Sequence, residues 1–477
     1  MSAPAMAPAT EHSTATRVGA AAILLPLLLV AVAGTLRFYR LGHPPRIYFD
    51  EVYYANDAKE VLDHGVERGF AVHPPVGKWV IAGGIALFGD DSFGWRFGVA
   101  VAGTLTVLAT YLLGLRLFRR RGVAALAAFL LAIDGLAFTM SRIAMLDMIL
   151  TLFVVTGAWL LLVDRDRMWA DLPEGPVEPG EPPPHRPRTY RWLAGVAFGL
   201  ALATKWSGLL AIGAAGLFLI GNELLWRRRT TGRPLHRWWR AAVSIGASLV
   251  LVPLLVYAAS YGGWFANFEQ TRQGQEQCRD GCALALPDIA GTWADEQLQI
   301  YRFHRDLTAE HPYRASPATW PLMLRPVAYY YESCDGEKLA NDECVVEPGN
   351  VAEVLGMGNP AIWWLALGAY AVVGWYAAAR RDWRAGLLLV FLLGQFLPWL
   401  ATSRPAFLFY TVPMLPFMTL ALAYAAWRSR EEPALRWVPF AILALAVAGF
   451  LFWYPVLAGV EMPKEAWQLR IWTSRWV

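Results

Sequence analysis

The stretch WLAGVAFGLALATKWSGLLAIGAAGLFLIGNELL, residues 192–225, decides how this chain folds. It is apolar over about 34 residues, and one helix of that length would be far longer than the roughly 30 Å apolar core of a bilayer. The sequence Lys205-Trp206-Ser207-Gly208, which contains a charged residue, interrupts it near the middle. We therefore predict two membrane-spanning helices here, at 192–205 and 207–225.

Composition places the whole chain in the same class. Of its 477 residues, 56% are hydrophobic and 17% are charged, whereas soluble domains carry roughly 25% charged residues. The net charge of +4 is too small and too dispersed to indicate nucleic-acid binding. These values predict an all-α polytopic membrane protein with about eleven spans. The other predicted spans are 18–36, 93–118, 122–140, 147–163, 241–259, 361–379, 385–401, 406–427 and 437–455.

The basic residues fix the expected orientation. About half of the 42 Lys and Arg residues fall in five connections. If 192–225 crosses twice, all five connections lie on one side, which the positive-inside rule makes cytoplasmic. A single crossing would invert every later segment. The five connections are 116–121, 165–191, 227–240, 380–384 and 428–436.

This topology divides the chain into segments with different surroundings. The Ala/Pro/Ser/Thr-rich residues 1–17 are expected to be a disordered cytoplasmic N-terminus. A transmembrane core at 18–259 contains a first outer loop, 37–92, in which we expect the catalytic residues. An extracytoplasmic loop at 260–360 precedes the last four helices, within 361–455, and an extracytoplasmic tail at 456–477. The Pro/Glu-rich residues 171–189 predict a flexible cytoplasmic linker.

All four cysteines lie in the second outer loop. Their confinement to the oxidising face favours one or two disulfides, and four cysteines allow three pairings. A zinc site is the alternative, but the loop's histidines do not fall in ligand spacing with the cysteines. The candidates are Cys278, Cys282, Cys334 and Cys344.

The first outer loop begins RIYFDEVYYANDAKEVLDHG and carries an adjacent carboxylate pair, Asp50-Glu51, among tyrosines such as Tyr54. Neighbouring side chains point to different faces of an element, so one carboxylate can meet a reacting group while the other orients a neighbour. Aromatic surroundings near lipid would raise a carboxyl pKa toward the range of a general base. The alternative is a solvated carboxylate pair beside an interfacial aromatic belt.

Further along the same loop, His73-Pro74-Pro75 is conformationally rigid, because each proline restricts itself and the residue before it. The apolar run 79–88 is too short to span and predicts a helix lying at the membrane interface, with Lys78 near the lipid headgroups.

Three cations lie at the outer ends of predicted spans, against the positive-inside bias. Arg142 shares the short turn SRIAMLD with Asp147, Lys205 lies at the break in 192–225, and Arg404 lies in TSRPAF. Local snorkelling, or pairing of Arg142 with Asp147, would account for each of them singly. Together they would suit a membrane-anchored phosphate.

Six motifs occur in an order that resembles the bacterial form of the protein O-mannosyltransferase family, over about 40–425. The resemblance implies the GT-C glycosyltransferase fold and mannose transfer from a polyprenyl-phosphate donor to Ser or Thr of secreted polypeptides, with membrane lipid around the enzyme and acceptors that meet it at the translocon. The motifs are FDEVYY at 49–54, HPPVGK at 73–78, SRIAMLD at 141–147, TKWSG at 204–208, HPYRASPATWP at 311–321 and GNP at 358–360.

The resemblance also implies residue roles. Asp50 corresponds to the base that deprotonates the acceptor hydroxyl, with Glu51 supporting it. Arg142 and Lys205 are expected to bind the donor phosphate, and Arg404 is added on position alone. Substrate-positioning roles are expected for Tyr54, His73, Pro74 and Asp147.

No cofactor or metal is expected. The sequence contains neither a Walker loop nor a GxGxxG motif after a strand, and no DxD-like pair lies at the predicted site. A single carboxylate base suffices for an inverting displacement from a lipid phosphate. Two alternatives stay open: a GT-C transferase that passes the sugar to a lipid or cell-wall glycan, and a transporter for lipid-linked sugars. Paired half-chain repeats would favour transport, and we find none.

Overall fold

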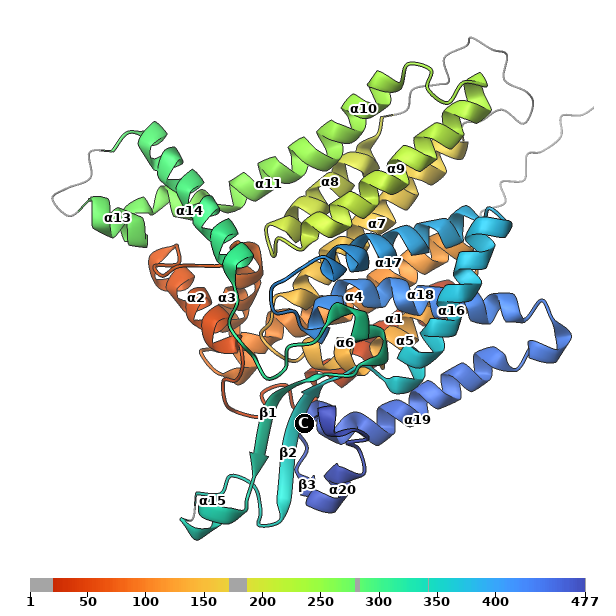
Figure 1. Ribbon diagram of the computed structural model, residues 1–477. Helices are drawn as coiled ribbons and strands as arrows, with labels where there is room; N and C mark the ends of the chain where they lie inside the picture. The colour runs from red at the N-terminus through yellow and green to blue at the C-terminus, as the bar shows by residue number, and fades with distance from the viewer. Residues whose placement is uncertain (1–19, 171–186, 279–283, 342, 477) are drawn as a thin grey trace, which may run out of the picture.

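The computed structural model describes residues 20–170, 187–278, 284–341 and 343–476 as a long helical bundle with a small sheet at one end (Figure 1). The predicted N-terminus 1–17 and most of the predicted linker lie outside these residues. The long helices of the bundle are α1 (Ala20–Phe38), α4 (Ser92–Phe118), α5 (Arg121–Ala132), α7 (Asp147–Ala170), α8 (Thr189–Leu202), α9 (Gly208–Thr231), α16 (Pro360–Ala379), α17 (Trp383–Leu400), α18 (Leu415–Ser429) and α19 (Val438–Ala458).

Short elements complete the bundle. A π-helical turn, Ala247–Leu251, joins α10 (Trp238–Gly246) to α11 (Val252–Ser260), and α6 (Gly135–Met140) follows α5. The 3-10 turns Leu408–Met414 and Pro433–Leu435 lead into α18 and α19. In the described part of the chain, eight helical stretches are long and apolar enough to cross a membrane, so the chain is a multi-pass membrane protein. The predicted span 122–140 is divided into α5 and α6, and α5 and α8 have only 12 and 14 residues. The count of eleven crossings stays a prediction.

The predicted break within 192–225 is confirmed. The first helix ends at Leu202 and the next begins at Gly208. A Cβ on Gly208 would lie 2.9 Å from backbone atoms of Ala201 and Leu202, so the tight return needs a glycine. Arg191, at the start of α8, donates to Glu223, near the end of α9, over 2.7 Å. The two helices therefore run antiparallel as a hairpin.

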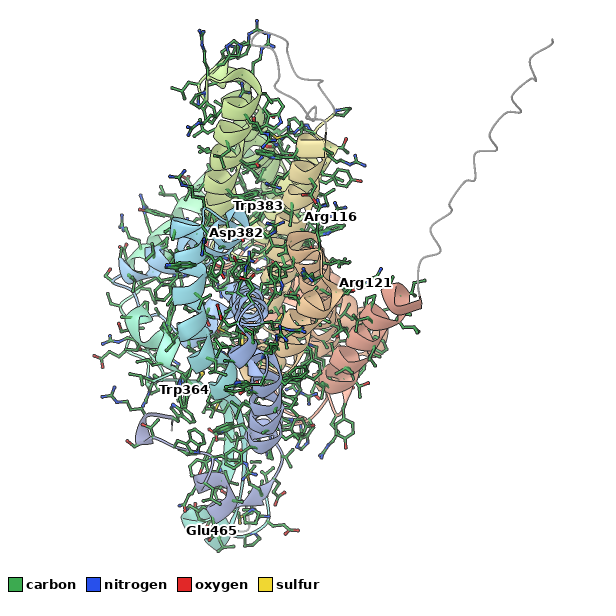
Figure 2. All side chains as sticks on the ribbon, turned by 90° about the vertical axis from the view of Figure 1, so that its right-hand side faces the viewer. Arg116, Arg121, Trp364, Asp382, Trp383 and Glu465 are labelled. Carbon is green, nitrogen blue, oxygen red and sulfur yellow. A yellow bond between two sulfur atoms is a disulfide. The ribbon has the colours of Figure 1, made fainter. Side chains whose placement is uncertain are left out.

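The basic connections meet at one end of the bundle, as the eleven-span prediction requires. Arg384 donates to the Leu117 carbonyl over 2.8 Å, and Arg428 pairs with Asp382 over 2.7 Å. Figure 2 shows Asp382 toward the end opposite Glu465. Because these connections lie at the same end of the bundle, the helices that they join run through the bundle in alternating directions.

Two regions lie outside the long helices, where the sequence predicted outer loops. The first contains α2 (Glu51–His64) and α3 (Val76–Phe88). The second contains α12 (Gly262–Ala266), the 3-10 turn Phe268–Gln270, α13 (Arg272–Gln277), α14 (Leu286–Asp306), the 3-10 turn Pro317–Leu322, β1 (Val327–Ser333), α15 (Gly336–Ala340) and β2 (Asn350–Gly356).

The C-terminal residues belong to the same unit as the second region, which the sequence did not reveal. β3 (Met462–Pro463) pairs antiparallel with β2, and β2 pairs antiparallel with β1. Trp467, in α20 (Lys464–Gln468), donates its indole N–H to the buried Glu353 over 2.6 Å. A last 3-10 turn, Ser474–Trp476, follows. The predicted tail is thus an integral part of the sheet.

The three cysteines that the structure describes are in disulfides, as predicted. Cys334 and Cys344 form a disulfide with Cα atoms 5.2 Å apart, which closes the segment between β1 and β2 and removes both residues as zinc ligands. Cys278 is also disulfide-bonded, and Cys282 lies outside the described residues.

The apolar run 79–88 is helical, as predicted, within α3, and its position at the membrane interface stays a prediction. The expected place of Lys78 is wrong. Its side chain is 1% exposed and its ammonium pairs with Glu67 over 2.6 Å and Asp57 over 3.3 Å. Two carboxylates supplied by α2 and the following loop satisfy the charge inside the protein, so Lys78 does not reach headgroups.

The buried ion cluster at the basic end gives a stability prediction. Replacing Glu223 by Ala should lower the free energy of unfolding in mixed micelles by about 2–3 kcal/mol, because Arg188 and Arg191 would share only Asp164. Denaturant titration of the purified protein measures this. Asp335→Asn, at the exposed pair with Lys464, is the control and should leave the titration unchanged. Equal behaviour of the two variants would contradict the role of the cluster.

Candidate active site

The position of Asp50 is set by its neighbour Glu51. Glu51 is fully buried and accepts hydrogen bonds from Arg96 Nε (2.8 Å), Arg96 Nη2 (3.0 Å) and the Ala144 N–H (2.8 Å). Asp50 is the N-cap of α2, and its carboxylate makes no hydrogen bond with any residue that the structure describes. The two carboxylates therefore differ in kind: Glu51 is saturated by the fold, whereas Asp50 is left available.

The residue before Asp50 adopts a strained conformation. Phe49 has φ of +53°, in the left-handed region that non-glycine residues rarely occupy. Its ring makes edge contacts with Tyr329, at 4.9 Å between centroids, and with Phe409, at 6.0 Å. Strain of this kind persists only where surrounding packing imposes it, and it concentrates at functional sites.

Arg142 binds the backbone at the end of α1, in the segment that leads to Asp50. Its two Nη groups donate to the carbonyls of Leu36, Arg37, Tyr39 and Arg40 over 2.7–3.2 Å. These carbonyls form the end of α1 and the turn after it. The pairing of Arg142 with Asp147, considered from the sequence, is not formed. Its Nη donors are committed to this turn, so the expected role of Arg142 at the donor phosphate stays a prediction that these contacts do not support.

Asp147 pairs instead with Lys205. The Lys205 ammonium donates to both carboxylate oxygens of Asp147, over 2.9 and 3.0 Å, and both side chains are largely buried. Asp147 is the first residue of α7, and Lys205 lies in the break between α8 and α9. The break between α8 and α9 thus also places the Lys205 ammonium at the site.

Asp50 lies within the electrostatic influence of this pair. The pKa of Asp50 is raised to about 6. Burial is the largest cause; the charge of Lys205 lowers the pKa, and the charge of Asp147 raises it. A carboxyl group with this pKa is largely ionised at neutral pH and is basic enough to accept a proton from a reacting hydroxyl.

A cavity of about 280 Å³ adjoins Lys205. Arg404 borders it and donates from Nη1 to His304 Nδ1 over 2.9 Å and from Nη2 to the Tyr410 hydroxyl over 3.0 Å. The Arg404 Nε is buried and has no hydrogen-bond partner among the described residues. The lining residues are His73, Lys205, Trp206, Ser207, Leu209, Leu210, His304, Pro398, Trp399, Thr402, Arg404 and Tyr410.

Hydrogen bonding determines the state of His304. Its Nε2 lies 2.9 Å from the Val72 carbonyl, which can only accept, so Nε2 carries the proton and Nδ1 accepts from Arg404. Burial lowers the pKa of His304 to about 4, and Arg404 and Lys205 contribute in the same direction. His304 is therefore a neutral histidine that orients the guanidinium.

His73 stacks on His304, with ring centroids 5.3 Å apart. Burial lowers the pKa of His73 well below its usual range, so this ring is neutral too. Its Nδ1 is buried without a hydrogen-bond partner among the described residues. Tyr54 lies beside it, at 6.0 Å between centroids. Pro74 is buried behind the histidine, at the start of the segment that enters α3.

The structure thus brings together most of the residues selected from the sequence. Asp50, Asp147 and Lys205 lie together, and His73 and Arg404 share the adjacent cavity with Lys205. Glu51 and Arg142 support them from outside the cavity. Sequence reasoning did not select His304, Tyr410 or Trp206. Trp206 lies within TKWSG and Tyr410 lies three residues after TSRPAF, whereas His304 lies outside the quoted motifs. No group of three or more His, Cys, Asp or Glu side chains in the described part of the chain is arranged to hold a metal ion.

The Lys205–Asp147 pair can be tested by a double-mutant cycle. Lys205→Met and Asp147→Asn should each lower the free energy of unfolding by about 3 kcal/mol, because each leaves a largely buried polar partner unsatisfied. The double variant should be more stable than the sum of the two losses predicts, by at least about 1 kcal/mol. Denaturant titration of the four proteins measures the coupling, and strictly additive losses would contradict a direct pair.

Comparison with protein families shows which proteins this chain resembles. Residues 27–92 and 89–265 match the model for dolichyl-phosphate-mannose-protein mannosyltransferase, and residues 290–476 match the C-terminal four-transmembrane region of protein O-mannosyltransferase. The polyprenol-phosphate-mannose–protein mannosyltransferase of Mycobacterium tuberculosis is 35% identical over 94% of this chain and 91% of its own length. The Corynebacterium glutamicum protein of the same name is 30% identical over 90% and 88%, respectively.

Solved structures share the fold. The Saccharomyces cerevisiae protein O-mannosyltransferase Pmt1–Pmt2 complex bound to the sugar donor has a TM-score of 0.76 at 15% identity, covering 95% of this chain and 92% of that one. ArnT from Cupriavidus metallidurans bound to undecaprenyl phosphate has a TM-score of 0.58 at 17% identity, covering 92% and 65%. The fold is therefore GT-C, as predicted. With both halves matched by its models and nearly full-length similarity to its members, this chain belongs to the dolichyl-phosphate-mannose-protein mannosyltransferase family.

Proposed function

We propose that this protein transfers mannose from polyprenyl-phosphate mannose to Ser or Thr hydroxyls of polypeptides, with Asp50 as the base. The observation that carries the proposal is the Asp50 carboxylate near Lys205, next to a cavity that Arg404 also borders. This carboxylate has no hydrogen-bond partner among the residues that the structure describes. The named activity of the mycobacterial and corynebacterial relatives supports the choice of donor and acceptor.

The reaction is a single displacement. The acceptor hydroxyl oxygen bonds to C1 of mannose while its proton passes to the Asp50 carboxylate. The bond between C1 and the phosphate oxygen breaks on the opposite side, and its electron pair leaves with the polyprenyl phosphate. One displacement inverts the configuration at C1, so no second carboxylate has to act as a nucleophile. Glu51 remains bound to Arg96 throughout and positions Asp50.

Lys205 and Arg404 bind the leaving phosphate in this scheme. Both border the cavity, and the unpartnered Nε of Arg404 offers a donor that the protein does not use. Cations placed where negative charge develops lower a barrier by a few kcal/mol each when they are fixed in advance. Asp147 fixes Lys205, and neutral His304 fixes Arg404. His73 borders the cavity, and Tyr54 packs beside His73. In this scheme these two residues, with Pro74 next to His73 in the chain, position the substrates.

The proposal includes a location. The basic connections gather at one end of the bundle, which the positive-inside rule assigns to the cytoplasm. Asp50 belongs to the opposite end, between α1 and α2, so the site faces the extracytoplasmic side of the cell membrane. Acceptors would then meet the enzyme as unfolded chains after crossing the membrane, for example at the translocon.

A transfer assay tests the function directly. Purified protein in micelles, incubated with polyprenyl-phosphate mannose and a Ser/Thr/Pro-rich peptide, should yield a mannosylated peptide detectable by mass spectrometry. Asp50→Asn should lower kcat by about 10²- to 10⁴-fold, the usual contribution of a general base, without changing thermal stability. Asp63→Asn is the matched control, since Asp63 is an exposed carboxylate of the same helix.

Full activity of the Asp50→Asn protein would remove Asp50 from the mechanism. Transfer to a lipid or glycan acceptor, with none to the peptide, would replace the proposed acceptor class while leaving the fold and donor site in place.

The pH dependence gives an independent check. Only the ionised Asp50 can accept a proton, so kcat/KM should fall tenfold per pH unit below an inflection near pH 6 and level off above it. Initial rates across that range measure the inflection, with protein stability followed in parallel. A profile that stays level through pH 6 would contradict the assigned base.

A further inference from the structure

The three-stranded sheet has one edge that the protein leaves open. The strand order is β1-β2-β3, so β3 covers the outer edge of β2 where the two pair. Within the described ranges, no backbone hydrogen bond reaches the outer edge of β1. An edge strand directs the N–H and C=O groups of alternate residues outward, where another extended chain can bind them.

Side chains on both faces of β1 make contacts within the protein. On one face, Glu332 pairs with Arg46 over 3.2 Å and Tyr330 contacts Tyr48 at 5.7 Å between centroids. On the other, Tyr331 contacts Trp467 at 5.7 Å. Figure 1 shows β1 as the outer strand, projecting away from the helical bundle. The edge sequence VAYYYES carries no proline and one charged residue, so it lacks the usual protection against strand pairing.

The first residues of β1 pack against the residue that precedes Asp50. A β-bulge inserts Tyr329 between Ala328 and Tyr330, and bulges of this kind redirect side chains next to active sites. The Tyr329 ring packs edge-on against Phe49, the residue before Asp50. A chain that pairs with residues 327–333 would therefore have one end close to Asp50.

We propose that β1 binds the acceptor polypeptide by strand addition. An extended segment of the acceptor would form a fourth strand along 327–333, and a Ser or Thr at the bulge end of that segment would present its hydroxyl to Asp50. Recognition through backbone groups selects an extended, unfolded chain and tolerates many side-chain sequences. This inference rests on the proposed function, because it assigns the acceptor of that same site.

Backbone methylation of the acceptor tests the hydrogen-bonding pattern. A peptide with a single Thr is made in versions that each carry one N-methyl group, at successive positions on either side of the Thr. Strand addition uses every second N–H, so kcat/KM should fall roughly three- to tenfold or more at alternate positions on one side. The positions between them, and the other side, should be tolerated. Uniform losses, or none, would overturn the proposal.

Hydrogen exchange tests the protein side without turnover. In the Asp50→Asn protein, amides within 327–333 should exchange more slowly when the unmethylated peptide is present. A peptide with proline at the alternate positions is the matched control and should give no protection. If protection instead appears without peptide and rises with protein concentration, a second copy of the chain occupies the edge, and the proposal is wrong.

The outcomes separate the proposed transfer activity from the proposed binding of the acceptor at β1. If no peptide is mannosylated but the peptide still protects 327–333, the proposed function fails and the binding edge stands. If peptides are mannosylated with no alternation and no protection, the function stands and the binding edge is excluded.

Discussion

The buried ion pair between Glu51 and Arg96 is the interaction on which the site depends. Both side chains are fully buried, and the pair joins the first turn of α2 to α4. Glu51 also accepts the Ala144 N–H, and Arg96 donates to the carbonyls of Leu41, Pro44 and Arg46. One pair thus connects two helices and two loops. Removing either partner would leave the other as an unpaired buried charge, which is strongly destabilising. The pair therefore fixes the geometry around Asp50.

The site contains polar groups that the fold leaves without hydrogen-bond partners. Several buried charges elsewhere are paired: Lys78 has two carboxylates, and Glu223 accepts from two arginines. A few buried atoms away from the site, such as Arg428 Nε, also have no hydrogen-bond partner among the described residues. At the site, the Asp50 carboxylate has no hydrogen-bond partner within the described residues, and Nε of Arg404 and Nδ1 of His73 likewise have none there. Buried polar groups are costly when unsatisfied, so such groups gathered around one cavity indicate a place for a polar ligand.

The same segment carries both topology and chemistry. The break at 203–207 turns the chain back through the membrane and exposes Lys205 beside Asp147. A continuous helix would invert every later segment and would remove the break that brings this cation to the site. Likewise, the sheet that recruits the C-terminal residues begins with the bulge that packs Tyr329 against Phe49. Fold and site therefore cannot be varied independently at these positions.

Much of this protein could be predicted from the sequence, because the bilayer restricts what an apolar segment can do. Helix lengths, the break at 205–208, the gathering of arginines at one end and the oxidised cysteines follow from local composition and sidedness. The motif residues Asp50, Asp147, Lys205 and His73 were also identified.

Only the tertiary structure decided which charges meet. Asp147 lies five residues from Arg142 along the chain yet pairs with Lys205, because α7 begins beside the α8–α9 break, while Arg142 turns back to the carbonyls after α1. Lys78 was predicted to contact lipid headgroups, but in the structure it is buried and paired with Glu67. His304 and the β1 edge come from a loop without periodicity, so their positions depend on long-range packing. Sequence spacing determines the neighbours within a helix, whereas the contacts between helices and loops decide which polar groups are satisfied and which remain free to react.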